Sequence, residues 1–492
     1  MRRLSTASRT ARAGESARTL SRLAEKTRVD AATLARMQSR SALTRAAASL
    51  ESDDAVLERV RLSRAHSLRL AYLSSLVSPD QIEKNVLSRL KSDPAQLLSF
   101  PGARVITGSK QVMKSLLEAH VVLEYEGRLY SLFVKDPEGR QVNEPSTERA
   151  VFGSKDAFVE MLDQNLGLIR QHAHDPDLRV DLLEVGTKAP TRIAVLSVRD
   201  LAPPEFHAWV VQRIETHPVP RLPFVSHLIA PLFGKIWSPF LPASFTERPD
   251  VVLDHLYRGR IAVLADGSPF ALMAPKTWMD DQREEETHLL SPITRIFIYL
   301  LRLSATFAAT ALPGFYVAVL TGNPNFLPGL LSISVASTRE AVPYPVITET
   351  LFLMFVFDIL AESTVSMKGV LGPSISIVGS LIIGDAAVRA NLASNLSVIV
   401  VAGTALGTFV TPHYWFSYGF RIWKYPIIGL AGLLGIMGWT VGVVWLVTHL
   451  AATRTLGVSY ASAFSRGHGN GATELFRVSP SRSTLPDPHA HT

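Results

Sequence analysis

The chain has 492 residues, of which 47% are hydrophobic and only 19% are charged, against roughly 25% charged residues in typical soluble domains. Residues 293–492 hold eleven of the 50 basic and seven of the 43 acidic side chains, so charge is concentrated in the first 292 residues. The absence of cysteine excludes disulfides, cysteine-containing zinc sites and thiol nucleophiles. We therefore expect a soluble N-terminal region followed by a membrane region.

Residues 1–50 form a basic arm with eleven basic and three acidic side chains. This surplus of eight exceeds the net charge of +7, so the overall charge does not indicate a nucleic-acid partner. The Arg- and Ser-rich composition matches both an organellar transit peptide and a segment lying on anionic lipid, and a solvated tail is the simplest alternative. No apolar secretory segment opens the chain, so we expect the soluble region to be cytoplasmic.

Residues 51–117 are predicted to be a helical lead-in to the folded region. Apolar residues recur there at helical spacing, among them Leu57, Val60, Leu68 and Leu73. Strand signals begin only near residue 119, where β-branched and aromatic residues gather.

Strands and helices alternate from residue 118 to residue 292, which indicates an α/β fold. We divide this stretch into two lobes, at 118–217 and 218–292. Runs of β-forming residues bounded by turn residues predict the strands, and Pro or Gly residues mark the helix ends. The strands are expected at 119–125, 128–134, 178–185, 192–199, 260–266 and 269–275, and the helices at 154–173, 204–214 and 249–259.

A transmembrane helical domain is predicted at 293–452, before a polar tail at 453–492. The first apolar run, 296–320, has 25 positions with Arg302 as its single charge and Pro313 as a kink, close to the ~20 residues that a bilayer requires. Four further apolar runs occupy 346–362, 374–388, 397–412 and 426–451. The third and fourth have 15 and 16 residues and suit a re-entrant pair, so four to five spans are expected.

Basic residues that flank the spans bear on their orientation. Arg295 and Arg302 lie at the start of the first span, Arg421 and Lys424 precede the last, and Arg454 follows it. The positive-inside rule places all of them on the cytoplasmic side, which five simple spans cannot satisfy. A re-entrant element restores an even count, so we expect both termini on the cytoplasmic side.

Four carboxylates lie within the apolar runs, at Glu349, Asp358, Glu362 and Asp385. Ionisable groups inside a membrane are costly and usually face a bundle interior or water, so these four are the candidates for an ion path or for gating. Glu349 and Glu362 stand near the ends of their run, where pairing in the headgroup region is the alternative. Asp385 precedes Arg389 by four residues, so an intrahelical ion pair is equally open. Asp358 has no partner within its own run and is the first choice.

Small residues spaced four apart predict close helix packing. Gly403 with Gly407, and Gly438 with Gly442, form small-xxx-small patterns that let helix backbones approach each other. A helix set this small needs neighbours to enclose a water-filled path, so we expect a homo-oligomer.

Motifs of catalysis are absent from the sequence, which has no Walker loop, no GxGxxG after a strand, no HExxH, no GxSxG and no paired-carboxylate pattern. We therefore predict no catalytic residue, no metal site and no cofactor, and we expect that the protein is not an enzyme.

One polar segment carries a resemblance to a known family. The stretch GRQVNEPSTERAVFGSKDAFVEMLDQN, at 139–165, is similar to the signature of the A-type subunits of bacterial spore germination receptors, the GerA family. Its core residues are Glu144, Pro145, Ser146, Thr147 and Glu148. Further stretches resemble the same family in collinear order up to about residue 460, among them STREAVPYPVITE and TRTLGVSY. The polar core, fixed by its proline, suits a subunit contact, with a structural turn as the alternative.

The resemblance implies a subunit of a nutrient-responsive germination receptor, integral to the inner membrane of the spore. It implies a transporter-like B subunit and a lipoprotein C subunit as partners, and an oligomeric, signal-gated cation channel as the activity. Two other functions stay open: a non-conducting signalling or scaffold subunit, and a related amplifying germination channel that is not itself a nutrient receptor.

Overall fold

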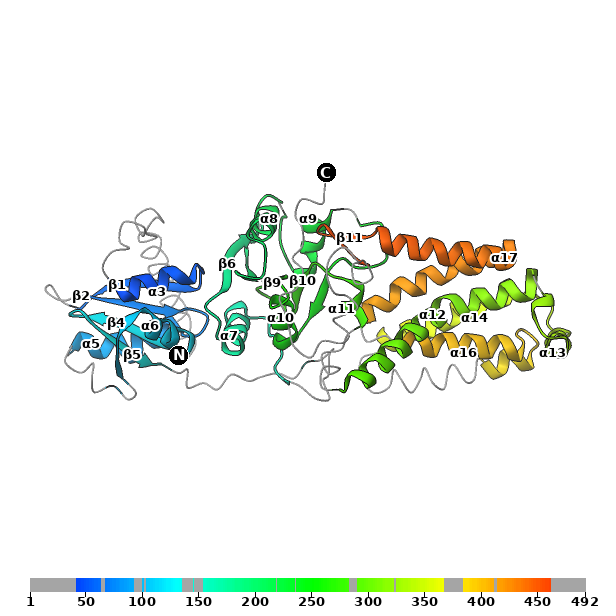
Figure 1. The fold of residues 1–492 in the computed structure, drawn as a ribbon, viewed down its shortest axis with the longest axis horizontal. Helices are drawn as coiled ribbons and strands as arrows, with labels where there is room; N and C mark the ends of the chain where they lie inside the picture. Colours follow the sequence, from blue (N-terminus) through cyan, green and yellow to red (C-terminus); the bar gives the residue numbers. More distant parts are fainter. Residues whose placement is uncertain are drawn as a thin grey trace, which may run out of the picture. The chain divides into compact units, whose positions relative to one another are not determined.

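The structure is a computed structural model in which the chain divides into two compact units (Figure 1). The first comprises Met1–Gln141 and Leu166–Asp181, and the second comprises Val142–Asn165 and Leu182–Thr492. The residues that the structure describes are 41–62, 67–92, 100, 103–134, 145, 154–217, 219–234, 236–282, 290–322, 324–366, 384–410 and 414–461. Most of the predicted basic arm and most of the predicted polar tail lie outside these residues.

The first unit contains an antiparallel sheet of five strands in the order β1-β2-β4-β5-β3. Glu126 and Gly127 both have positive φ and connect β4 to β5, as the two central residues of a type I′ turn do. Leu43 of α3 and Val112 of α6 share one buried core with Leu70 of the sheet. The elements are α3 (Ala42–Leu50), β1 (Ala55–Arg61), β2 (Ser67–Leu73), α4 (Pro79–Ile82), α5 (Ser88–Ser92), β3 (Arg104–Ile106), α6 (Gly108–Leu117), β4 (His120–Tyr125) and β5 (Arg128–Phe133).

The prediction of a helical lead-in at 51–117 is wrong where β1, β2 and β3 lie. Val56 of β1 pairs with Tyr72 of β2, and β2 pairs in turn with β4. Leu68 and Leu70 are both buried and stand two residues apart, which is the period of a strand with one buried face. The helical interpretation used the wider spacings and missed this one. The predicted lobe boundary at residue 118 consequently falls inside the first sheet.

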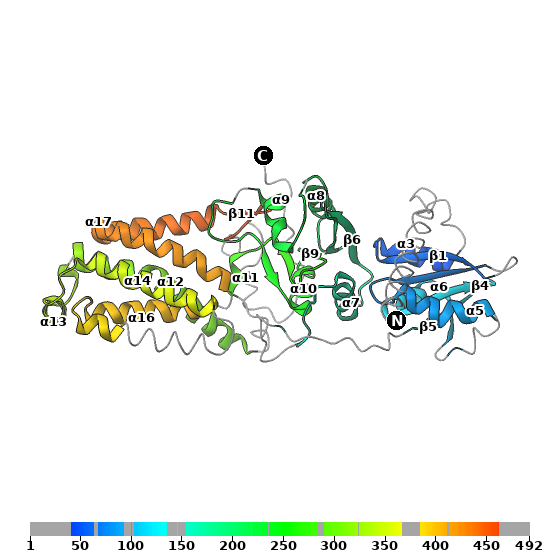
Figure 2. The same ribbon diagram turned by 180° about the vertical axis from the view of Figure 1, so that it is seen from behind.

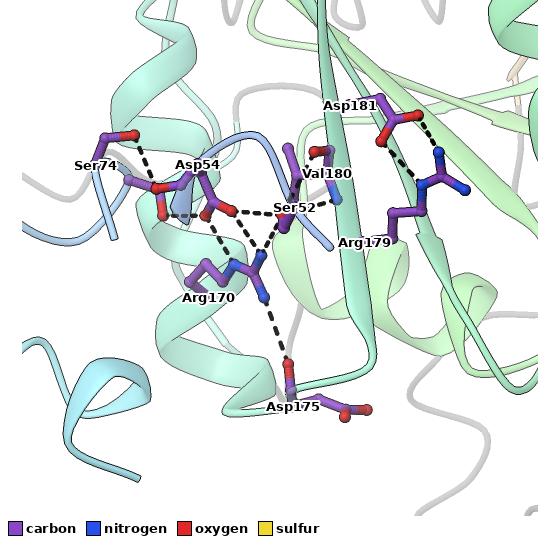
Figure 3. A network of polar contacts seen from close by, with 9 residues as sticks. Ser52, Asp54, Ser74, Arg170, Asp175, Arg179, Val180 and Asp181 are labelled. Atoms are coloured by element: carbon purple, nitrogen blue, oxygen red, sulfur yellow. Dashed lines mark hydrogen bonds and ion pairs between the residues drawn. The ribbon is translucent and has the colours of Figure 1, made fainter. Parts of the chain in front are cut away.

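A buried ion pair ties α7 (Leu162–Ala173) into the first unit (Figure 3). Arg170 donates to the carboxylate of Asp54 from Nε to Oδ2 over 2.9 Å and from Nη2 to Oδ1 over 2.8 Å, and the two side chains are 0% and 1% exposed. Ser52 and Ser75 donate to the same carboxylate over 2.5 and 2.7 Å. Desolvation by burial opposes ionisation, but Arg170 and these hydrogen bonds outweigh it and lower the pKa of Asp54.

The second unit begins with a five-stranded sheet in the order β6-β7-β9-β10-β8. Phe206 and Val210 of α8 and Leu232 of α9 pack with Val195 and Val263 of the sheet in one buried core. The elements of this part are β6 (Leu178–Val185), β7 (Thr191–Val198), α8 (Pro204–Glu215), α9 (Ile229–Phe233), β8 (Ser244–Thr246), α10 (Pro249–Leu256), β9 (Ile261–Ala265), β10 (Ala271–Ala274) and α11 (Trp278–Gln282). The predicted alternation of strands and helices is confirmed.

One helix of this region starts later than predicted. α7 begins at Leu162 instead of residue 154. The side chain of Asn165 bonds to the backbone of Val159 in both directions, accepting from its N–H over 2.8 Å and donating to its carbonyl over 2.6 Å. These bonds occupy backbone groups that a longer helix would use internally.

Helices make up the rest of the second unit (Figures 1 and 2). They are α12 (Pro292–Gly322), α13 (Gly329–Arg339), α14 (Val346–Ser366), a short helix at 384–389, α16 (Asn395–Phe409) and α17 (Tyr414–Ala452). Among the residues that the structure describes, Pro292–Gly322 and Phe416–Ala452 are long and apolar enough to cross a membrane. Most of the third predicted run, 374–388, lies outside the described residues.

α17 is a hairpin of two legs, 414–434 and 436–452, that lie side by side in both views (Figures 1 and 2). At Gly435 the backbone leaves the helical conformation, with φ 62° and ψ −141°. Trp423 and Trp445, one on each leg, have ring centroids 5.0 Å apart. The fifth apolar run was expected to be a single span, but the chain turns back within it. The re-entrant pair expected in the third and fourth runs stays a prediction, because most of the third run lies outside the described residues.

The hairpin defines two ends of the helical part, a tip at Gly435 and a base where both legs meet α11. A Cβ added at Gly322, the last residue of α12, would lie 2.7 Å from the Cα of Gly435, so α12 ends at the tip. Near its start, Arg302 donates from Nη1 to the carbonyl of Gln282 over 3.0 Å, at the base. The rings of Trp423 and His449 lie 5.2 Å apart, so the basic residues of the first leg stand level with the end of the second. The basic residues of the first leg and the residues that follow α17 therefore lie toward the same end of the helical part, while the side of the membrane that this end faces stays a prediction.

Candidate functional site

Asp358 on α14 accepts hydrogen bonds from three side chains on the first leg of α17. Lys424 Nζ lies 2.8 Å and Arg421 Nε 3.2 Å from Asp358 Oδ1, and the Tyr425 hydroxyl lies 2.5 Å from Oδ2. The side chain of Lys424 is 1% exposed, that of Arg421 9% and that of Asp358 17%. These four residues, the Asp358 cluster, therefore join α14 to α17 and place two cations against one carboxylate.

Aromatic rings surround the two cations of this cluster. Lys424 Nζ lies 5.3 Å from the ring centroid of Tyr425 and 6.0 Å from that of Phe357. Arg421 Cζ lies 5.0 Å from the ring centroid of Tyr418. Ring faces attract cations and take the place of water beside them. The Asp358 cluster is thus a partly desolvated site with a formal charge of +1.

Glu362 lies one turn beyond Asp358 on the same face of α14. Its carboxylate is exposed and accepts a hydrogen bond from the Tyr418 hydroxyl over 2.7 Å. The predicted shared face of these two carboxylates therefore turns toward the first leg of α17, with Asp358 buried more deeply.

Glu349 lies at the other end of α14 and binds the N-terminus of α16. Its carboxylate accepts from the Ser394 N–H over 2.6 Å, from the Ser397 hydroxyl, and from Arg339 over 2.5 Å. Ser394 is the N-cap of α16, where free N–H groups and the helix dipole favour negative charge. The Tyr316 hydroxyl of α12 lies 2.8 Å from that of Ser397. Glu349 thus connects α14 to α16 at the tip.

Asp385 is separate from both of these groups. It pairs with Arg389, four residues on, with Arg389 Nε 2.8 Å from Asp385 Oδ2, and the side chains are 78% and 56% exposed for Arg389 and Asp385. This is the intrahelical pair that the sequence left open. The four predicted carboxylates therefore belong to three different places, and Asp358 is the one that holds buried cations.

The sequence interpretation missed the partners of Asp358. It assigned Arg421 and Lys424 to the flank of a span by the positive-inside rule, and it did not consider Tyr425. The signal that points to them is charge balance, since three carboxylates in one apolar run require cations nearby. The segment FRIWKY holds two cations among aromatic residues immediately before the last apolar run.

The glycines of the predicted packing patterns differ in how closely other atoms approach them. An added Cβ at Gly407 would meet the Ala305 carbonyl of α12, and one at Gly438 would meet the Leu430 carbonyl of the opposite leg of α17. The distances from the added Cβ to the nearest atom are 2.6 Å at Gly407, 1.9 Å at Gly438, 3.1 Å at Gly442 and 3.8 Å at Gly403. The first three are shorter than ordinary contacts, so these glycines allow close packing within one chain.

At the base, α11 and the residues that follow α17 connect the sheet to the helices. The backbone N–H of Trp278 donates to the Tyr460 carbonyl over 2.8 Å, and the Tyr460 hydroxyl donates to Asp281 over 2.6 Å. Lys276 Nζ lies 2.7 Å from the other oxygen of Asp281. Burial, with the neighbouring Asp281 charge, raises the pKa of Tyr460 well above its usual value, so the hydroxyl stays a donor.

Five aromatic residues, the base cluster, fill the space between α11 and α17. Trp278 lies 5.1 Å from Phe416 and 5.5 Å from Phe420 between ring centroids, and Phe240 lies 5.0 Å from Phe420. The ring centroid of Tyr460 lies 6.2 Å from that of Phe240, with the two rings tilted. Because all five are at most 7% exposed, the base cluster packs α11 directly against the start of the hairpin and the residues that follow it.

The predicted subunit-contact motif is mostly outside the described residues. Pro145 is buried, whereas Glu144, Thr147 and Glu148 lie outside them. Among the residues that the structure describes, there is no group of three or more His, Asp or Glu side chains that could hold a metal ion.

Comparison with known proteins identifies the family. The family model described as Bacillus/Clostridium GerA spore germination protein matches residues 42–487. The chain belongs to the GerA family. Relatives of this GerA-family chain include the uncharacterized membrane protein YfkQ of Bacillus subtilis, 31% identical over 385 residues that cover 78% of this chain and 75% of that protein. Spore germination protein KA of the same organism is 28% identical over 444 residues, covering 87% of this chain and 82% of that protein.

A third relative and one solved structure extend this comparison. Spore germination protein GerQA of Bacillus cereus is 30% identical over 415 residues, covering 82% of this chain and 83% of that protein. The N-terminal domain of the A subunit of the Bacillus megaterium spore germinant receptor GerK3 aligns with a TM-score of 0.36 and 21% identity, over 47% of this chain and 92% of that domain. The predicted membership in the GerA family is confirmed by the family match.

Proposed function

We propose that this GerA-family chain is a membrane subunit of a spore germination receptor, and that its helical part forms an oligomeric, signal-gated cation channel. The germination role is supported by a family match across residues 42–487. It is also supported by relatives named as spore germination proteins, which align with this chain over most of their own length. The gate is supported by the Asp358 cluster. This cluster is the observation that carries the proposal.

We place the helices in the membrane with the base on the cytoplasmic side. α12 runs from base to tip, α14 and α16 run from tip to base, and α17 goes to the tip and returns. The soluble region and the residues after α17 then share one side, together with the basic residues Arg302, Arg421 and Arg454.

In the conformation of the structure, Asp358 is not free to bind a permeating cation. Lys424 and Arg421 occupy its carboxylate, and their combined charge repels a further cation. We therefore assign this conformation to the closed channel. Breaking a buried ion pair costs about 3–5 kcal/mol, so a pore that opens by separating α14 from α17 is open less than about 1% of the time without a signal.

The base cluster gives the signal a route to this gate. A partner that displaces the sheet moves α11, and Trp278 contacts Phe416 and Phe420 at the start of the leg that carries Arg421 and Lys424. The partners that we propose are a transporter-like B subunit and a lipoprotein C subunit in the inner membrane of the spore. The nutrient signal would reach this chain through them.

Purification of the protein from spore membranes in mild detergent, followed by mass identification of co-purifying proteins, tests the receptor assignment. A transporter-like protein and a lipoprotein in the same complex are the expected result. Recovery of the protein by itself, or with a different small membrane partner, would favour an amplifying channel. Vesicles that stay tight to cations while the partners remain bound would favour a non-conducting signalling or scaffold subunit.

A further inference from the structure

The loop between α9 and β8 presents an unusually exposed aromatic side chain. Trp237 is 92% exposed, the highest value among the large apolar side chains that the structure describes, and Ile236 beside it is 37% exposed. Phe240, three residues on, is 2% exposed within the base cluster, and Leu232 before the loop is 3% exposed. The Trp237 loop, residues 236–240, is therefore attached at a buried anchor while its indole points away from the protein.

Contacts with α17 fix where this loop lies. The Ser238 hydroxyl, next to Trp237, lies 2.9 Å from Nε2 of His449 in the last turn of the second leg. The ring of Phe240 lies 6.2 Å from that of His449. The same leg exposes apolar side chains before His449, with Val444 57% and Val447 59% exposed. Trp237 thus stands beside the end of a helix whose outer face is apolar.

The lengths of the helices place this point at a membrane surface. Twenty residues separate Gly322 at the tip from Arg302 at the base, which is ~30 Å of helix and matches the hydrocarbon thickness of a bilayer. The second leg, 436–452, is ~25 Å long and also starts at the tip. The end of this leg therefore lies within ~5 Å of the level of Arg302, and His449, three residues earlier, lies ~4–5 Å further toward the tip, so the Trp237 loop meets the helix close to this boundary. Tryptophan is the residue most suited to this depth, because its ring is apolar and its N–H is polar.

We propose that the Trp237 loop inserts into the lipid headgroup region on the base side and anchors the sheet of the second unit to the bilayer surface. This inference rests on the proposed membrane placement of the helices. We assign lipid as the partner of Trp237 because contact with the end of this chain's own spanning helix sets the depth of the loop. That contact lies within one chain and does not depend on which subunits surround it.

The absence of cysteine from the sequence permits a direct test of this contact. Trp237→Cys is made in the full chain, labelled with a nitrobenzoxadiazole fluorophore and reconstituted into phosphatidylcholine–phosphatidylglycerol vesicles. Quenching by lipid nitroxides, one near the headgroup and one deep in the acyl chain, is compared with quenching by aqueous iodide. The exposure of Trp237 makes the substitution compatible with folding.

Two further variants serve as references. Val444→Cys, 57% exposed on the second leg, reports whether the hairpin is in the membrane. Trp209→Cys, 41% exposed on α8, is the aqueous reference, since α9 lies between α8 and α17 in both views (Figures 1 and 2). We expect lipid quenching at position 237 to exceed that at position 209 by at least about three-fold, because an interfacial indole contacts lipid directly.

The outcomes separate this inference from the proposed function. Lipid quenching at 444 together with none at 237 above the level at 209 would overturn the anchor and leave the membrane placement standing. Absence of lipid quenching at 444 would overturn the membrane placement and the anchor with it. Protection of position 237 from both quenchers, in the complex extracted from spore membranes, would show that a protein covers the loop and would also overturn the anchor.

Discussion

Replacing Arg170 by methionine is expected to destabilise the first unit by about 3–5 kcal/mol, because the Asp54 carboxylate stays buried after its counter-ion is removed. Ser52 and Ser75 still donate to the carboxylate in this variant, and methionine keeps most of the apolar part of the arginine side chain. The expected decrease in stability therefore comes from the loss of the ion pair and not from lost packing or lost hydroxyl donors. At about 1.4 kcal/mol per factor of ten, hydrogen-exchange protection should fall about 100- to 4,000-fold.

Hydrogen–deuterium exchange on the detergent-solubilised full chain, read in peptides that cover β2, measures this change. Tryptophan fluorescence does not report on this unit, because the first tryptophan of the chain is Trp209. Arg179→Met is the matched control: Arg179 pairs with Asp181 over 2.8 Å, but the two side chains are 35% and 16% exposed (Figure 3). Its expected cost is at most about 1 kcal/mol, or about five-fold in protection. Equal effects of the two arginine variants would show that burial does not make the Arg170–Asp54 pair more important for stability than the exposed pair.

Three further results follow from the structure. The pKa of Asp54 is lower in the folded state, so ionised Asp54 stabilises the first unit at pH values above the unfolded-state pKa of about 3.9. This stabilisation is lost as the pH falls below that value, so the free energy of unfolding should be smaller at pH 3 than at pH 4 and pH 7. Gly438→Ala should destabilise the hairpin by about 1–3 kcal/mol or more and Gly403→Ala should not, as followed by tryptophan fluorescence on heating. Tyr460→Phe removes a donor to buried Asp281 and should cost about 1–3 kcal/mol, with a red shift of tryptophan emission.

Local patterns were sufficient to predict much of the α/β region. The turn at Glu126 and Gly127 and the alternating residues on each side of it identify a hairpin without any distant contact. β1 and β2 could not be predicted in this way. β2 pairs with β4, more than 40 residues further along the chain, and that pairing selects strand over helix for a stretch whose spacing fits both.

The turn at Gly435 could not be predicted from the sequence because the residues around it are also typical of a continuous membrane helix. Glycines recur at 429, 432, 435 and 438 within an unbroken apolar run, and glycine is common both in packed membrane helices and in turns. Two observations distinguish a turn from a packed helix here: the positive φ at Gly435 and the contact between the two legs. Both are properties of the folded chain.

The candidate site could be predicted in part. Asp358 stands out in the sequence as a carboxylate within an apolar run, and the cost of burying a charge marks it without a structure. Its partners follow 63 to 67 residues later on a different helix. Only the packing of α14 against the first leg of α17 brings Lys424 and Arg421 to it.

We propose that the channel opens when Asp358 separates from the cations of α17. This separation is tested most directly by following cation release from spores that carry Asp358→Asn, with and without nutrient. Asp385→Asn is the control, since the Asp385–Arg389 pair is exposed and separate from the cluster. A second variant, Asp358→Lys combined with Lys424→Asp, exchanges two charges and keeps one carboxylate against two cations.

We expect Asp358→Asn spores to release cations without nutrient or at a lower nutrient level, because the closed state loses its ion pair. We expect the charge exchange to restore dependence on nutrient, and Asp385→Asn to behave like the unaltered chain. Unchanged release from Asp358→Asn spores, in both extent and nutrient dependence, would show that the Asp358 cluster does not hold the channel closed.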